Sequence, residues 1–154
     1  MIIDKRNEFA DALALNTGGA GTYLLGNVID TDPAAIAPND TVDLQGSEMF
    51  LVVQVDTAAT SAGAATLQIK LASDAQAAIA TDGSATEHLA LPAVAVADLT
   101  AGKMIACVKL PSGAYERYLG ILQVTGTAAF TAGKINVFLT SDPAIWKPYA
   151  DNVN

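Results

Sequence analysis

The chain has 154 residues, a length that fits one domain, 1–154, with a buried core. Its net charge of −8, from 8 basic and 16 acidic residues, excludes nucleic-acid binding as a leading function, because phosphates are neutralised by clustered Lys and Arg. Apolar residues make up 51% of the chain and charged residues 16%, which excludes disorder, and no apolar run approaches the roughly 20 residues of a membrane span.

Residues 1–21 are predicted to form an arm or a flexible segment before the main fold. Positions 9–15 fit both a helix face and a strand, and we favour an extended arm. The glycine-rich run 18–21 is interpreted as a flexible turn, because no Lys-Ser or Lys-Thr pair follows it as in a phosphate-binding loop. Lys5 and Arg6 form the only basic pair in the first half of the chain, so the arm is a candidate contact with a partner.

The clearest structural signal is an alternation of apolar and polar residues with a period of two, which is typical of half-buried strands. Leu67, Ile69 and Leu71, for example, alternate with polar neighbours. The strongest segments are 48–56, 66–72, 103–110 and 134–140. Weaker candidates are 22–29, 41–44, 86–91 and 118–124.

Turns rich in Gly, Pro and Asp separate these segments. About eight short strands divided in this way predict an all-β protein, an antiparallel two-sheet sandwich for which a jelly roll is one option. Only 74–80 is a candidate helix, and its Ala-rich composition without an apolar stripe fits a loop equally well.

The residues that usually carry catalysis or bind metals are scarce. His88 is the only histidine and lies in a predicted strand, where a satisfied structural role is much commoner than metal ligation. Cys107 is the only cysteine, which excludes an internal disulfide, and its apolar neighbours predict an inert packed thiol. A calcium site remains a minor alternative for four acidic residues, although they lack the spacing of a calcium loop. These residues are Asp30, Asp32, Asp40 and Asp43.

Several stretches are distinctive beyond their composition. They are 110–120, Ala132–Pro143, Ile3–Lys5 with Phe9–Ala12, and the aromatic residues Trp146 and Tyr149. Together they resemble the jelly-roll capsid cement proteins of the Bordetella-phage type. The resemblance extends over essentially the whole chain, and the string Tyr-Glu-Arg-Tyr-Leu-Gly at 115–120 is its most specific part.

The resemblance implies a structural virion protein, without enzymatic activity or a cofactor, that binds the outer surface of an icosahedral capsid. Its implied partners are the major capsid protein and a second copy of itself, and it is synthesised in the cytoplasm of the host bacterium. A carbohydrate- or receptor-binding module of a phage tail or fibre is the alternative. Tyr and Arg are enriched at interface hot spots. We therefore choose the candidate contact residues mainly among the aromatic and basic side chains of these stretches. They are Lys5, Arg6, Tyr115, Arg117, Tyr118, Trp146 and Tyr149.

For two of these sites the residues themselves leave a second interpretation open. Arg117 fits an ion pair with Glu116 or another acid inside the fold as well as it fits an interface. The tail around Trp146 fits a partner anchor, but sealing of the open end of the sandwich is slightly favoured.

Overall fold

The computed structural model describes residues 5–31, 42–43 and 48–143. In these residues the protein is all-β, with eleven strands, two short 3-10 turns and no α-helix. None of its described helical turns is long and apolar enough to cross a membrane. The turns are η1 (Lys5–Asn7) and η2 (Val96–Asp98). The strands are β1 (Glu8–Ala14), β2 (Gly21–Asp30), β3 (Val42–Asp43), β4 (Phe50–Ser61), β5 (Thr66–Asp74), β6 (Thr86–Ala90), β7 (Val94–Ala95), β8 (Met104–Lys109), β9 (Ala114–Tyr115), β10 (Tyr118–Gly126) and β11 (Phe130–Thr140).

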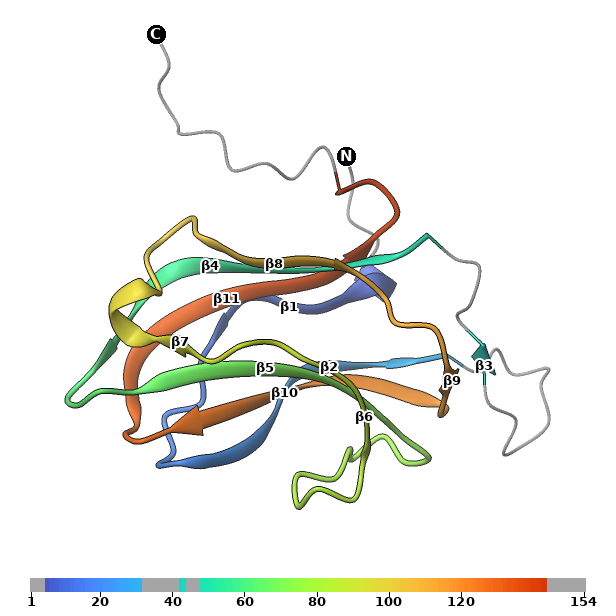
Figure 1. Ribbon diagram of the computed structural model, residues 1–154, viewed down its shortest axis with the longest axis horizontal. Coiled ribbons are helices and arrows are strands. Elements are labelled where there is room, and N and C mark those ends of the chain that lie inside the picture. The colour runs from blue at the N-terminus through green and yellow to red at the C-terminus, as the bar shows by residue number, and fades with distance from the viewer. Residues whose placement is uncertain (1–4, 32–41, 44–47, 144–154) are drawn as a thin grey trace, which may run out of the picture.

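The strands form two facing sheets, as Figure 1 shows. Sheet A has the order β1-β11-β4-β8, and sheet B has the order β2-β10-β5-β6, with β7 also paired to β5. The short strands β3 and β9 pair separately. Among the eight longer strands the first pairs with the last, the second with the seventh, the third with the sixth and the fourth with the fifth, always antiparallel. This nested pairing is that of a jelly roll, so the predicted sandwich of about eight strands is confirmed.

The alternation seen in the sequence places one face of each sheet in a shared core. Leu51, Val53 and Val55 on β4 are at most 1% exposed, and so are Leu67, Ile69 and Leu71 on β5. Each predicted segment corresponds to a strand, and for 41–44 the structure describes Val42 and Asp43, which form β3. The candidate helix 74–80 is a bent loop after the end of β5.

The N-terminal segment is the main correction to the predicted fold. Residues 1–21 were expected to be an arm or flexible segment, but β1 is an edge strand of sheet A, and Phe9 is 0% exposed. The pairing of β1 with β11 shifts register twice, and Ala12 has a φ of 44° while its N–H donates to Asn136 Oδ1. Such irregularities interrupt the period of two, which explains why positions 9–15 gave an ambiguous pattern.

Candidate functional site

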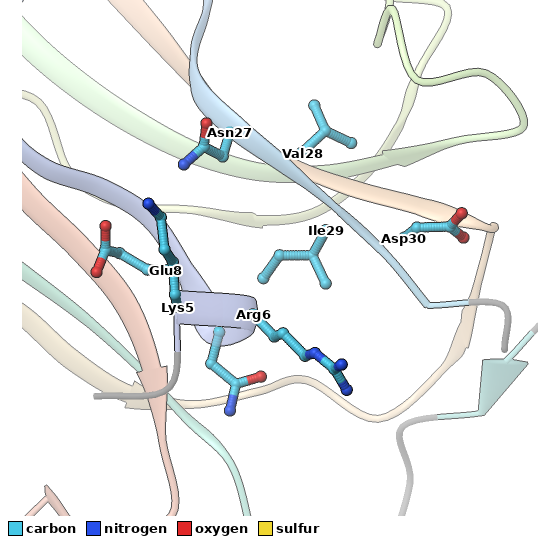
Figure 2. Close-up of a pocket in the computed structure, with 8 residues that line it drawn as sticks. Lys5, Arg6, Glu8, Asn27, Val28, Ile29 and Asp30 are labelled. Carbon is cyan, nitrogen blue, oxygen red and sulfur yellow. The ribbon is translucent and has the colours of Figure 1, made fainter. Parts of the chain in front are cut away.

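An open hollow in the described surface lies where β1 and β2, edge strands of the two sheets, run side by side. It is an open groove with a volume of about 630 Å³. Figure 2 shows η1 on one side of it and the last residues of β2 on the other. Its lining residues are Lys5, Arg6, Asn7, Glu8, Asn27, Val28, Ile29 and Asp30. Both predicted arm cations, Lys5 and Arg6, are exposed here, so the fold brings them to the lining of this groove.

Charges of both signs lie in this groove, which we name the β1–β2 groove. Lys5 and Arg6 contribute two cations, and Glu8 and Asp30 contribute two carboxylates. Asn7 and Asn27 add two side-chain amides to the lining. A surface of this kind suits a polar protein partner, because paired charges and amides give orientation and specificity at an interface rim.

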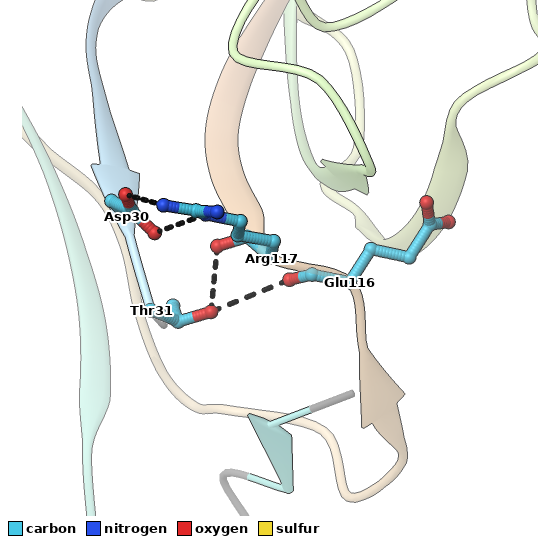
Figure 3. Close-up of polar contacts among 4 residues, drawn as sticks. All are labelled: Asp30, Thr31, Glu116 and Arg117. Atoms are coloured by element: carbon cyan, nitrogen blue, oxygen red, sulfur yellow. Dashed lines mark hydrogen bonds and ion pairs between the residues drawn. The ribbon is translucent and has the colours of Figure 1, made fainter. Parts of the chain in front are cut away.

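Arg117, directly before β10, forms an ion pair with Asp30 at the end of the neighbouring strand β2 (Figure 3). Its Nε and a terminal nitrogen donate to the two carboxylate oxygens of Asp30 at 3.0 and 2.9 Å. The guanidinium also lies 5.0 Å from the ring centre of Tyr118, a cation–π distance. Thr31 holds the adjacent backbone, because its N–H and hydroxyl both donate to the carbonyl of Arg117. The structure therefore shows one of the two predicted roles of Arg117, an ion pair within the chain, with Asp30 as its partner, and the interface role stays a prediction.

Tyr115 was predicted as an interface residue, and this assignment is corrected. The residue is 0% exposed, and burial raises the pKa of its hydroxyl. Its hydroxyl donates to the carbonyl of Pro111 at 2.5 Å, and its ring stacks on His88 with 4.0 Å between ring centres. Aromatic and charged residues that are neighbours in a sequence are typical of interfaces, which is why Tyr115 was selected. In the fold, the short strand β9 directs the Tyr115 ring into the core. Tyr118 is half-buried, and Trp146 and Tyr149 lie outside the described residues.

A serine and a histidine form a contact that the sequence did not predict. Ser73 Oγ lies 2.7 Å from His88 Nε2 and accepts a hydrogen bond from the N–H of Glu116. The carboxylate of Glu116 accepts a hydrogen bond from Thr86. A serine beside a histidine is the arrangement of an activated nucleophile, but Ser73 is 0% exposed. A substrate has no access to this oxygen, so the contact supports the strands β5, β6 and β9.

Comparison with known proteins identifies the family of the chain. The model of the Bbp16 family matches residues 9–139, from β1 to the end of the sandwich at β11. The chain belongs to the Bbp16 family. The family name points to a protein of a Bordetella phage, which agrees with the phage origin expected from the sequence. No curated protein matches the chain.

The remaining candidate ligands of this Bbp16-family protein do not converge in the described residues. No group of three or more His, Cys, Asp or Glu side chains there is arranged to hold a metal ion. Asp30 is engaged by Arg117. Asp32 and Asp40 lie outside the described residues, and so does the side chain of Asp43. Burial raises the pKa of the Cys107 thiol, which keeps it in the protonated, less nucleophilic form.

The stability of the Bbp16-family protein should fall when the pH drops below about 6.5, and His88 should be one cause. Burial lowers the pKa of His88 from 6.5, and nearby Glu116 opposes this shift only in part. The unfolded chain therefore binds a proton before the folded chain does, and the stability is lost as the pH falls through this window. Urea unfolding of the wild type and His88→Asn between pH 5 and 7 measures the effect.

His88→Asn should show the smaller loss of urea midpoint over this range. Ser73→Ala is the matched control, because it removes the hydrogen bond to His88 and retains the burial that dominates the shift. It should keep the pH dependence of the wild type. Equal slopes for the wild type and His88→Asn would contradict the prediction.

Proposed function

We propose that the protein is a capsid cement protein, which binds the outer surface of an icosahedral phage shell and stabilises contacts between capsomers. The observation that carries the proposal is membership of a phage family across 9–139, over a complete jelly-roll sandwich. The proposed location is the outside of the virion, after synthesis in the host bacterial cytoplasm. The net charge of −8 supports an exterior position, since packaged DNA repels an acidic protein.

The mechanism of a cement protein is adhesion and needs no chemistry. Many identical copies each add a modest interface energy, and the regular lattice adds these contributions together. The sandwich suits this task, because long antiparallel ladders such as β4–β11 and β5–β10 join its strands into a stiff body. The absence of enzymatic activity is part of the proposal.

We propose the β1–β2 groove as the surface that contacts the major capsid protein. Lys5 lies in η1, directly before β1, so the sheet holds its position. A cation fixed at an edge can pair with a carboxylate on the shell and orient each copy.

A second copy of the chain is the other proposed partner. The edge strand β8 favours a homodimer, because Met104 to Val108 form an apolar, half-buried row without the charges that usually protect an edge.

A carbohydrate- or receptor-binding module is the second candidate from the sequence. Sugar sites usually offer an aromatic ring on which a sugar can stack. Among the described residues, the lining of the β1–β2 groove includes no aromatic side chain. No observation favours this candidate over the cement role.

The direct test is the heat resistance of matching mature capsids with and without added protein. Cement should raise the temperature at which capsids release DNA, and the effect should saturate at a fixed ratio of copies to capsomers. Lys5→Glu should weaken binding by roughly 1–4 kcal/mol per copy if Lys5 is a hot spot. Lys134→Glu is the matched control, because Lys134 is also an exposed lysine but lies on β11, outside the groove and not beside β8. Capsids that melt identically with saturating protein would refute the proposal.

Arg117→Ala should lower the stability of the free protein and leave capsid binding nearly unchanged. Its ion pair with Asp30 is about two-fifths exposed on each side, so the loss should be about 1 kcal/mol, including the contact with Tyr118. Thermal unfolding of the free protein and saturation of capsids measure the two effects separately. Weaker capsid binding with unchanged melting would place Arg117 at the shell instead.

A further inference from the structure

The outer face of sheet A, the face turned away from sheet B, buries apolar side chains. Leu51 and Val53 on β4 belong to the central core, so Val52 between them points outward, and Phe138 on β11 points outward in the same way. Val52 is nevertheless 1% exposed and Phe138 is 2% exposed. The two residues are paired across the strands, and Cys107 on β8 continues their row.

Buried apolar residues on an outward face indicate a third layer, because such a face is normally polar. On the outer face of sheet B, the described residues include such a third layer. Ile79, from the loop after β5, covers Ala72 and Leu122 on the outer face of sheet B and forms a second small core with them. Val52 and Phe138 belong to neither of the two core clusters of the described residues. The structure contains this chain alone, so the layer that buries them is to be sought in another part of the same chain.

The end of β11 directs the chain toward this outer face. Thr140 is two residues after Phe138, so its side chain is on the same face, and it is 7% exposed. Its hydroxyl accepts a hydrogen bond from the N–H of Asp142 at 3.2 Å and lies 3.5 Å from the carbonyl oxygen of Asp142. The backbone at Asp142 thus lies over the outer side of sheet A, where Figure 1 shows the red turn after β11.

We propose that the outer face of sheet A is a docking surface for the chain's own C-terminal segment, 144–154. This segment lies outside the described residues, begins directly after the turn and contains Trp146 and Tyr149. Eleven residues span up to about 40 Å when extended, whereas Phe138 lies only about 7 Å back along the strand from Thr140. An aromatic side chain supplies the large apolar area that would cover Val52 and Phe138. The inference does not depend on the cement role.

The sequence makes this docking directly measurable, because Trp146 is the only tryptophan and Cys107 the only cysteine. In the full chain, the emission of Trp146 should be that of a buried indole and should resist quenching by iodide. Trp146→Ala, and a chain that ends at Pro143, should each make Cys107 react several-fold faster with a thiol reagent, since Cys107 lies beside Val52. An exposed Trp146 together with an unchanged rate at Cys107 would overturn the proposal.

A double-mutant cycle tests the contact without deleting the segment. Trp146→Ala and Val52→Ala should be non-additive in urea unfolding, because residues in contact couple. Trp146→Ala and Leu122→Ala should be additive, since Leu122 lies on the outer face of sheet B. Additivity in both cycles would overturn the proposal.

Two further experiments separate the other possible occupants. Replacing Ile2 and Ile3 by Ser tests the N-terminal residues, and the rate at Cys107 should not change. A faster reaction in that variant alone would assign the cover to the N-terminus and reject the C-terminal segment. The shielding of Trp146 should also be independent of protein concentration. Loss of shielding on dilution to a monomer would assign the face to a second copy.

Discussion

Replacing Phe9 by Ala should lower the free energy of unfolding by about 3–5 kcal/mol, the range for a fully buried phenylalanine. The side chain is 0% exposed and belongs to the central core, although the sequence placed it in an arm or flexible segment. Truncation leaves a cavity between β1 and the facing sheet, which close neighbours fill only in part. Urea unfolding at neutral pH measures the loss.

Asp11→Ala is the control on the same strand, because Asp11 is exposed. Surface substitutions usually change stability by less than about 0.5 kcal/mol, so the two variants should differ by several kcal/mol. A cost below about 1 kcal/mol for Phe9→Ala would mean that β1 contributes little and that residues 1–21 behave as an arm after all.

The sandwich could be predicted because most of its strands alternate regularly. On β4 and β5, one residue in two enters the core, and the sequence records this pattern directly. On β1 the pattern fails, because two register shifts and the positive φ of Ala12 change which residues face inward. Only pairing with β11, more than 100 residues later in the chain, decides the orientation of Phe9. A local pattern contains no information about that partner.

The candidate site was predictable in composition but not in geometry. The string at 115–120 was singled out as the most specific part of the resemblance, and two of its residues, Tyr115 and Arg117, contact distant segments of the same chain. Arg117 pairs with Asp30, 87 positions earlier, and Tyr115 stacks on His88, which belongs to another strand. Lys5 was predicted as part of an arm, whereas β1 and β2 hold it at a groove. Each of these differences arises from contacts between distant segments.

Tyr115→Ala should be as damaging as Phe9→Ala, with a loss of about 3–5 kcal/mol. The substitution removes a side chain that is 0% exposed, together with its stacking on His88 and its hydrogen bond to Pro111. Tyr115→Phe keeps the ring and removes only the hydroxyl, so it should cost about 0.5–1.5 kcal/mol. Thermal and urea unfolding of both variants separate the contribution of the ring from that of the hydrogen bond.

Tyr23 provides a matched comparison for the hydroxyl. Its hydroxyl also donates to a carbonyl four positions earlier, that of Gly19, but in an exposed setting. Tyr23→Phe should therefore cost less than Tyr115→Phe, because water replaces the lost partner at an exposed carbonyl. If Tyr115 is a core residue, Tyr115→Phe should saturate capsids at the wild-type ratio while it melts at a lower temperature. Normal melting with weakened capsid binding would instead return Tyr115 to the interface predicted from the sequence.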